Sequence, residues 1–226
     1  MKFSEKTWDW FIKRTGLVNN TLWNSFHWKK YLQEEQKKSH GLIGYDWGDP
    51  ENPKDPYGNY KQILDWLQTG ISSDSHVLEI GSLGGKWTQY MSYARLVTCV
   101  DLFEETFDFL NKRLGDRLNL QFYKTKGNEL RGISSDSVDL VFSMDAFPRI
   151  PKKSIQRYLF EIFRVLNRDG KVLIHLPCQD IPFCRRKAFT PISSQWIRKT
   201  VEAIGFRVPQ FHFDLIKHGI ILQAVK

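Results

Sequence analysis

The stretch VLEIGSLGGKWT, residues 77–88, decides the fold of this chain. An apolar run of strand length ends in a turn that holds three glycines, and a segment with a helical pattern follows. Glu79 stands two residues before Gly81, the first of these glycines. In doubly wound α/β sheets, ligands bind at the carboxyl ends of the strands, and glycines in the first turn let the backbone approach the ligand closely. We therefore expect Gly81 and Gly85 to line a ligand site at this turn.

A second acid ends the next strand-like run, LVTCVD, residues 96–101. Asp101 follows the first glycine by about 20 residues, the position from which a carboxylate accepts hydrogen bonds from both hydroxyls of a ribose. A domain that binds NAD expects glycines in the pattern G-x-G-x-x-G. Here the glycines are Gly81, Gly84 and Gly85, so the order of elements indicates a nucleoside cofactor while the spacing disfavours NAD.

Strand-like runs alternate with helical patterns from residue 60 to residue 205, which is typical of βαβ units in a parallel sheet. The expected helices are 60–70, 86–94, 104–115, 152–167 and 193–205, and the expected strands are 76–81, 96–101, 120–126, 138–147, 171–177, 207–216 and 219–226. The last two runs are joined only around Lys217 and His218, and so short a connection forces an antiparallel pair. The sequence thus predicts an α/β, Rossmann-like, doubly wound sheet of seven strands, six of them parallel and the terminal one antiparallel.

The start of the chain differs from the rest in composition. It holds five of the eight tryptophans, which are Trp8, Trp10, Trp23, Trp28 and Trp47. Two short helices fit there, followed by a link rich in proline and glycine at residues 44–60. We expect residues 1–56 to form a helical lid or extension, and residues 57–226 to form the main domain.

Length and composition favour one domain with one sizeable core, since the chain has 226 residues of which 41% are apolar. No signal-peptide pattern and no run of about 18 apolar residues occurs, so we expect a soluble, cytoplasmic protein without a membrane partner. The three cysteines have no C-x-x-C spacing and are expected to be reduced, unliganded thiols.

The net charge of +8 is concentrated late in the chain. The residues concerned are Arg149, Lys152, Lys153, Arg157, Arg185, Arg186, Lys187, Arg198 and Lys199. Scattered basic residues are usually solvated helix faces or loops. The functional alternative is a rim that attracts an anionic small molecule or RNA, although no signature of an RNA-binding module accompanies it.

Residues 79–85 resemble motif I of the class I S-adenosylmethionine-dependent methyltransferases, E/D-x-G-x-G-x-G, and Asp101 resembles the ribose-binding acid of that family. The segment FRVLNRDGKVLIH, residues 163–175, is similar to the region that joins the family's fourth and fifth strands. The resemblance covers residues 57–226 and implies S-adenosylmethionine as cofactor. The cofactor contacts it implies are Glu79, Gly81, Ser82, Gly85, Trp87, Asp101, Leu102, Gly127, Asn128 and Ser143.

The sequence departs from the family pattern at two positions. Leu83 stands where the middle glycine of motif I is usual. Lys126 stands where an aspartate often binds the adenine amino group, and a lysine cannot accept a hydrogen bond. Adenine recognition would then fall to the backbone near Gly127 or to the side chain of Asn128, unless Asn128 only shapes a turn.

Methyl transfer from a sulfonium is an in-line displacement that depends mostly on alignment and desolvation, so a catalytic motif can be absent. For a hydroxyl acceptor, Asp145 is the candidate general base, since it follows the buried strand 138–147; the alternative is that it caps the next turn. Related small-molecule methyltransferases often carry a histidine near position 149. Arg149 stands there instead and is expected to bind a carboxylate or phosphate of the substrate.

The remaining histidines and aromatics give weaker signals. His175 lies inside an apolar run and is expected to be a satisfied core residue, and His218 in the terminal hairpin is expected to be structural or solvent-facing. No set of ligands has the spacing of a metal site, so no metal is expected. In this superfamily the N-terminal segment commonly covers the active site, and we expect Trp47, Tyr57 or Tyr60 to contact the cofactor or the acceptor.

The leading interpretation is an S-adenosylmethionine-dependent methyltransferase that acts on oxygen or nitrogen of a small-molecule or sugar-containing acceptor. An RNA methyltransferase is the alternative that the basic charge suggests, although SMDAF, residues 143–147, lacks the N/D-P-P-Y/F pattern of base amino methylation. A non-catalytic protein that keeps the fold is the alternative that Leu83 and Lys126 suggest. The expected partner is therefore a small molecule, anionic or glycan-like, rather than a nucleic acid.

Overall fold

The structure is a computed structural model that describes residues 48–186 and 189–226. The tryptophan-rich start, including Trp47, lies outside the described residues. The proposed N-terminal unit, residues 1–56, is therefore seen only from Gly48 onward.

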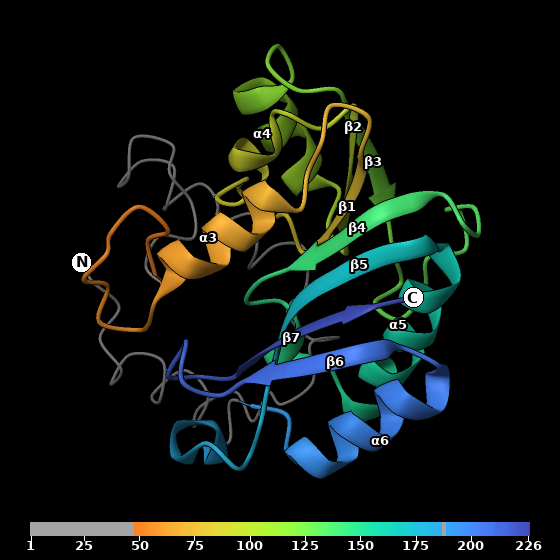
Figure 1. Ribbon diagram of the computed structural model, residues 1–226. Helices are drawn as coiled ribbons and strands as arrows, with labels where there is room; N and C mark the ends of the chain where they lie inside the picture. Colours follow the sequence, from red (N-terminus) through yellow and green to blue (C-terminus); the bar gives the residue numbers. More distant parts are fainter. Residues whose placement is uncertain (1–47, 187–188) are drawn as a thin grey trace.

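Seven strands form one sheet in the order β3-β2-β1-β4-β5-β7-β6 (Figure 1). Their bounds are β1 His76–Ile80, β2 Leu96–Asp101, β3 Leu120–Lys124, β4 Val138–Ser143, β5 Leu166–Leu176, β6 Arg207–His212 and β7 Ile220–Val225. The pairs from β3 to β5 are parallel, and β7 runs antiparallel to both β5 and β6. The expected α/β fold is confirmed, with β7 inserted between β5 and β6.

Within the described residues, four α-helices cover the two faces of the sheet (Figure 1), namely α3 Tyr60–Thr69, α4 Glu105–Leu114, α5 Lys152–Val165 and α6 Ser194–Ile204. Alternate residues of the strands point to opposite faces. Val77 and Phe142 join the core beneath α3 and α4, while Leu78 and Val141 join the core beneath α5 and α6. Among the described helices, none combines the length and the apolar character needed to cross a bilayer.

The segment after the glycine turn is shorter than expected. A helix was predicted at residues 86–94, but only the four-residue 3-10 helix η3, Thr88–Met91, forms there. A helix that runs back along a six-residue strand needs about 13 residues to cover the same length. The chain has only residues 86–95 before β2 begins at Leu96, so a full α-helix does not fit.

Two strands, β4 and β6, each end four residues earlier than expected, and both corrections matter for the site. β4 ends at Ser143, and the short 3-10 helix η4, Phe147–Arg149, follows it. β6 ends at His212, so the connection to β7 spans residues 213–219.

The loop 213–219 leaves the sheet because it pairs with the link that precedes α3. Ile216 forms an isolated antiparallel bridge with Gly58. The Asn59 N–H donates to the Leu215 carbonyl at 2.7 Å, and the Lys217 N–H donates to the Tyr57 carbonyl at 2.9 Å. This pairing fixes both segments at the carboxyl edge of the sheet.

Candidate active site

The ends of β1 and β4 meet where the strand order reverses, which is the place where doubly wound sheets bind ligands. Gly81 follows β1 directly and has a φ of 80°. A Cβ on Gly81 would lie 2.5 Å from the Cβ of Ala146, so no larger residue fits between the two strand ends. The glycine turn therefore lies directly beside the segment that carries Asp145.

Asp101, at the end of β2, faces the glycine turn. Its carboxylate accepts hydrogen bonds from the backbone N–H groups of Leu83 at 3.3 Å, Leu102 at 2.7 Å and Phe103 at 3.2 Å. Burial raises the pKa of Asp101 to about 6, although these backbone hydrogen bonds lower it. The group that the sequence assigned to the ribose is thus a buried carboxyl tied to the turn.

Glu79 is buried within β1 and accepts a hydrogen bond from the Thr88 hydroxyl at 2.5 Å. Burial raises the pKa of Glu79 to about 7, and the Thr88 hydrogen bond opposes this shift. Glu79 therefore changes its charge close to neutral pH, and η3 holds its carboxyl in place.

Leu83 and Gly85 both have a positive φ in the glycine turn. Leu83 has a φ of 43°, a left-handed conformation that costs a residue with a side chain about 1–2 kcal/mol. Gly85 has a φ of 78°, and a Cβ there would lie 3.0 Å from Leu114 and 3.3 Å from Leu110 on α4. The absence of a side chain at Gly85 allows the turn to pack closely against α4.

The loop after β3 packs against the end of β2. A Cβ on Gly127 would lie 3.1 Å from the Leu102 side chain, and the Gly127 N–H donates to the Thr125 hydroxyl at 3.1 Å. Asn128 is half-buried, whereas Lys126 is exposed. The structure thus brings together Leu102, Gly127 and Asn128, three of the residues assigned to the cofactor.

Three further residues assigned to the cofactor are buried around the turn. The Ser143 hydroxyl donates to the Ile80 carbonyl at 2.7 Å and so joins β4 to β1. The Trp87 ring packs on Phe142 with 5.2 Å between centroids, and its Nε1–H has no hydrogen-bond partner in the part of the chain that the structure describes. Ser82 is also buried.

Four side chains from separate parts of the chain meet beside the turn. Oδ1 of Asp145 lies 3.1 Å from Nδ1 of His175 and 2.9 Å from Nε2 of His218. Oδ2 of Asp145 lies 3.4 Å from Nζ of Lys86, the residue after Gly85. His175 is fully buried, and the side chains of His218 and Lys86 are 7% and 8% exposed. We refer to Lys86, Asp145, His175 and His218 as the Asp145 cluster.

The Asp145 cluster is built around an ionised carboxylate. Burial would raise the pKa of Asp145, but the Lys86 ammonium and hydrogen bonds from the two histidines hold it well below its usual range. Burial lowers the pKa of Lys86, against the attraction of Asp145, and burial also lowers the pKa of His175. A carboxylate with so low a pKa is a weak base, and Asp145 makes no helix cap at η4.

The link before α3 closes over this cluster. Lys86 donates to the Gly48 carbonyl at 3.2 Å. The Tyr60 ring is fully buried, and its hydroxyl has no partner among residues 48–186 and 189–226. Tyr57 is about one-third exposed, with its ring 6.4 Å edge-on from that of His218. Two of the residues assigned to the substrate therefore lie at the cluster, while Arg149 lies half-buried on η4.

Sequence reasoning missed the Asp145 cluster, apart from Asp145 itself. His218 is buried, so the solvent-facing interpretation is wrong, and His175 contacts Asp145 as well as the core. The expected topology did contain one signal. β6 runs parallel to β1, so the loop that follows β6 lies at the carboxyl edge of the sheet, where Asp145 also lies. Linear spacing also gave no hint that ligand atoms of Asp145, His175 and His218 lie within 4.8 Å of one another.

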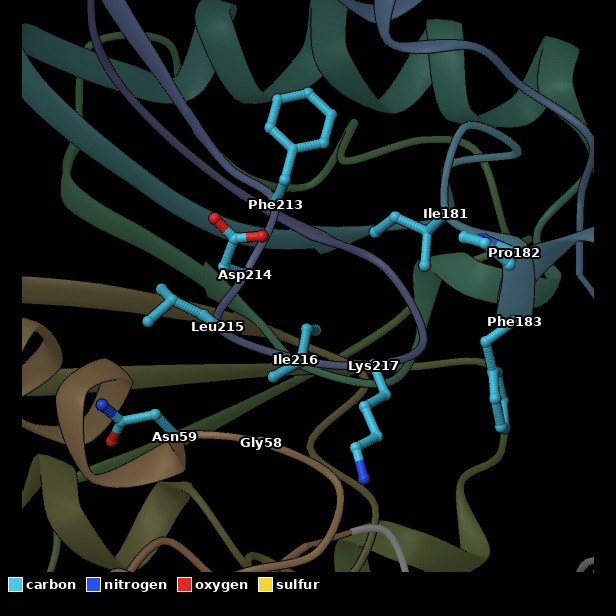
Figure 2. A pocket seen from close by; sticks show the side chains of 10 residues that line it. All are labelled: Gly58, Asn59, Ile181, Pro182, Phe183, Phe213, Asp214, Leu215, Ile216 and Lys217. Carbon is cyan, nitrogen blue, oxygen red and sulfur yellow. The ribbon is translucent and has the colours of Figure 1, made fainter.

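An open pocket of about 410 Å³ adjoins the loop that carries His218. Figure 2 shows its three borders, which are the link at Gly58 and Asn59, the turn at residues 181–183, and residues 213–217. The Phe183 ring, on the second border, lies 6.5 Å from the His218 ring. The pocket therefore lies beside the loop that places His218 in the Asp145 cluster.

Comparison with known proteins gives one family match and many matches of fold. Residues 78–174 match the family model of a methyltransferase domain. This match contains the glycine turn, Asp101, Asp145 and β5 as far as Ile174. No curated protein matches the chain.

Several solved structures have the same fold. An S-adenosylmethionine-dependent methyltransferase from Aquifex aeolicus has a TM-score of 0.60 and 18% identity over 90% of this chain and 98% of that chain. Phosphoethanolamine N-methyltransferase 2 from Haemonchus contortus, solved with phosphomonomethylethanolamine and S-adenosylhomocysteine, has a TM-score of 0.63 and 17% identity over 88% and 60% of the two chains. A complex of the Haloferax volcanii Trm112 methyltransferase activator with a methyltransferase gives a TM-score of 0.64 and 14% identity over 89% and 97%. At these identities the likeness concerns the fold.

Proposed function

We propose that this chain is a class I S-adenosylmethionine-dependent methyltransferase that methylates oxygen or nitrogen of a small-molecule or sugar-containing acceptor. Residues 78–174 match the family model of a methyltransferase domain, and solved S-adenosylmethionine-dependent methyltransferases share the fold. The observation that carries the proposal is the meeting of the glycine turn with Asp101 on one side and the Asp145 cluster on the other. The side with Asp101 suits the nucleoside of the cofactor, and the side with the Asp145 cluster suits the methyl acceptor.

The cofactor lies along the ends of β1 and β2 in this proposal. The backbone of the turn from Gly81 to Gly85 holds the amino-acid end, and Asp101 accepts the ribose hydroxyls. Leu102, Gly127 and Asn128 border the adenine. S-adenosylmethionine supplies an electrophilic methyl group on a sulfonium when it is bound.

The acceptor lies between the turn and the loop 213–219. Tyr60 and Trp87 each offer a buried, unpaired donor there within the described residues. Desolvation raises the pKa of Tyr60 well above its usual value, so its hydroxyl keeps its proton and serves as a donor. Arg149 binds a carboxylate or phosphate of the acceptor. The neighbour from Haemonchus contortus, solved with a phosphorylated amine, supports an acceptor of small size.

The protein contributes alignment and exclusion of water, because the displacement itself asks for little else. The link around Gly48 covers Lys86 and Tyr60, and in our proposal residues 1–56 cover the acceptor during transfer. Removal of residues 1–56 without loss of turnover would contradict this role.

Calorimetry of the full chain with S-adenosylmethionine and with S-adenosylhomocysteine tests the cofactor half of the proposal. We expect heat from both, and absence of heat would favour a non-catalytic protein that retains the fold. Incorporation of labelled methyl groups into fractionated small metabolites then tests the acceptor half. Incorporation only into macromolecules would contradict it.

RNA is the second candidate acceptor, and the net charge of +8 is the observation that favours it. RNA binding through phosphates releases counterions, so its affinity falls steeply as salt rises. We expect only weak RNA binding. A steep salt dependence together with labelled RNA would favour the second candidate.

A further inference from the structure

His218 has one ring nitrogen that is buried without a partner. Nε2 lies 2.9 Å from Oδ1 of Asp145, whereas Nδ1 is buried and makes no hydrogen bond to the described residues. An ionised carboxylate only accepts, so the ring proton of neutral His218 belongs on Nε2. Nδ1 is then left with a free lone pair. A buried acceptor without a donor is destabilising, and a bound ligand that brings a proton removes this penalty.

We propose that His218 is the general base of the methyl transfer, acting through Nδ1, and that Asp145 is the positioning residue that fixes its tautomer. This inference rests on the function proposed above. It also narrows the acceptor to a hydroxyl or amine whose attacking oxygen or nitrogen carries a proton.

The reaction transfers one methyl group and one proton. The acceptor's lone pair forms a bond to the methyl carbon, and the carbon–sulfur bond breaks with its electron pair going to sulfur. The acceptor's proton passes to Nδ1 of His218. The imidazolium that results lies against the carboxylate of Asp145, which stabilises the new charge without taking a proton.

Asp145 is poorly suited to be the base itself. Both of its oxygens are engaged, Oδ1 by the two histidines and Oδ2 by Lys86. A carboxylate held in this way has little tendency to accept a proton, but it orients an imidazole well.

Neighbouring groups hold His218 from several elements. The backbone carbonyl of His218 lies 3.2 Å from Nε2 of His175, and the two rings meet edge-on at 4.8 Å. The groups around the ring are Asp145 from the end of β4, His175 from β5, Tyr57 and Tyr60 from the link and α3, and Phe183 from the turn after β5. Lys86 reaches the ring only through Asp145.

The first test measures the rate of methyl transfer by the full chain. The acceptor is the small-metabolite fraction into which wild-type protein incorporates labelled methyl groups. His218→Gln keeps an N–H for Asp145 but has no nitrogen that takes a proton. We expect it to lower transfer about 10²–10⁴-fold and to leave S-adenosylmethionine affinity within about twofold. His218→Ala should lose as much activity and recover part of it with added imidazole, which a structural role would not allow.

His212→Gln is the matched control, since His212 lies on β6, bonded to Gln223 and stacked on Trp66. We expect full activity from this variant. Loss of transfer with His218→Gln but no rescue of His218→Ala by imidazole would overturn the base role. If calorimetry shows no heat when S-adenosylmethionine is added to wild-type protein, the function on which the inference rests is overturned instead.

The tautomer provides a second test that needs no acceptor. In ¹⁵N-histidine-labelled protein at pH 8, we expect the His218 signal, identified by its loss in His218→Gln, to show protonated Nε2 and unprotonated Nδ1. We expect Asp145→Asn to weaken that preference. A protonated Nδ1 would overturn the proposal. So would a stoichiometric divalent metal on the purified protein that is lost in both His218→Gln and His175→Gln, because the cluster would then be a metal site.

Discussion

At the scale of single residues, Asp101 is the sharpest test of cofactor binding. Asp101→Ala should weaken S-adenosylmethionine binding by about 1–3 kcal/mol, because the ribose hydroxyls would lose their buried acceptor. Calorimetry measures the change. Asp108→Ala on the exposed side of α4 is the control and should bind as wild type does. Equal affinities for wild type and Asp101→Ala would place the ribose elsewhere.

Glu79 gives a prediction about pH. Its folded pKa of about 7 lies above the ordinary value of 4.5, so the native state binds more protons than the unfolded state between these two pH values. The contribution of Glu79 to stability therefore falls as pH rises across this window, by up to about 3 kcal/mol. His175, whose pKa burial lowers, acts in the opposite direction.

The comparison of wild type with Glu79→Gln isolates this effect, because His175 is unchanged in both. We expect chemical unfolding between pH 5 and pH 8 to show wild type losing stability relative to Glu79→Gln as pH rises. Parallel curves for the two proteins would mean that Glu79 titrates normally.

At the scale of elements, the loop 213–219 depends on close contact with β5. A Cβ on Gly219 would overlap Nε2 of His175 and approach the Leu176 carbonyl. Gly219→Ala should therefore displace the His175 ring and lower the free energy of unfolding by about 1–3 kcal/mol. Lys217→Ala, at an exposed site in the same loop, should change it little. Denaturant titration distinguishes the two, and equal stability would show that the contact relaxes easily.

The elements were predictable where local patterns decide them. The strands β1, β2 and β4 follow from apolar runs, and the glycine turn and Asp101 follow from their spacing along one βαβ unit. The loop 213–219 was not predictable in this way, because its shape depends on pairing with Gly58 in a distant segment. His218 reaches Asp145 only through that pairing, across 73 residues. A full helix was expected at residues 86–94, where only η3 forms. The residue pattern does not show how long a helix must be to run back along β1.

At the scale of the whole molecule, a ligand at the switch point bridges the ends of several strands and should stabilise the entire fold. With S-adenosylmethionine at about 100 times its Kd, we expect a gain of about 2.7 kcal/mol. Thermal unfolding with and without the ligand measures this gain as a rise in Tm. ATP at the same concentration is the control, since it shares the adenosine but has no sulfonium or amino-acid end. Equal protection by ATP would indicate a general nucleotide site.

The insertion of β7 between β5 and β6 also has a consequence for folding. β6 precedes in the chain the strand that joins it to the sheet, so β5 and β6 each keep one more unpaired edge until β7 docks between them. Unpaired edges are templates for intermolecular association. A folding intermediate that lacks β7 is thus the species most in need of chaperone protection, and docking of β7 completes the sheet.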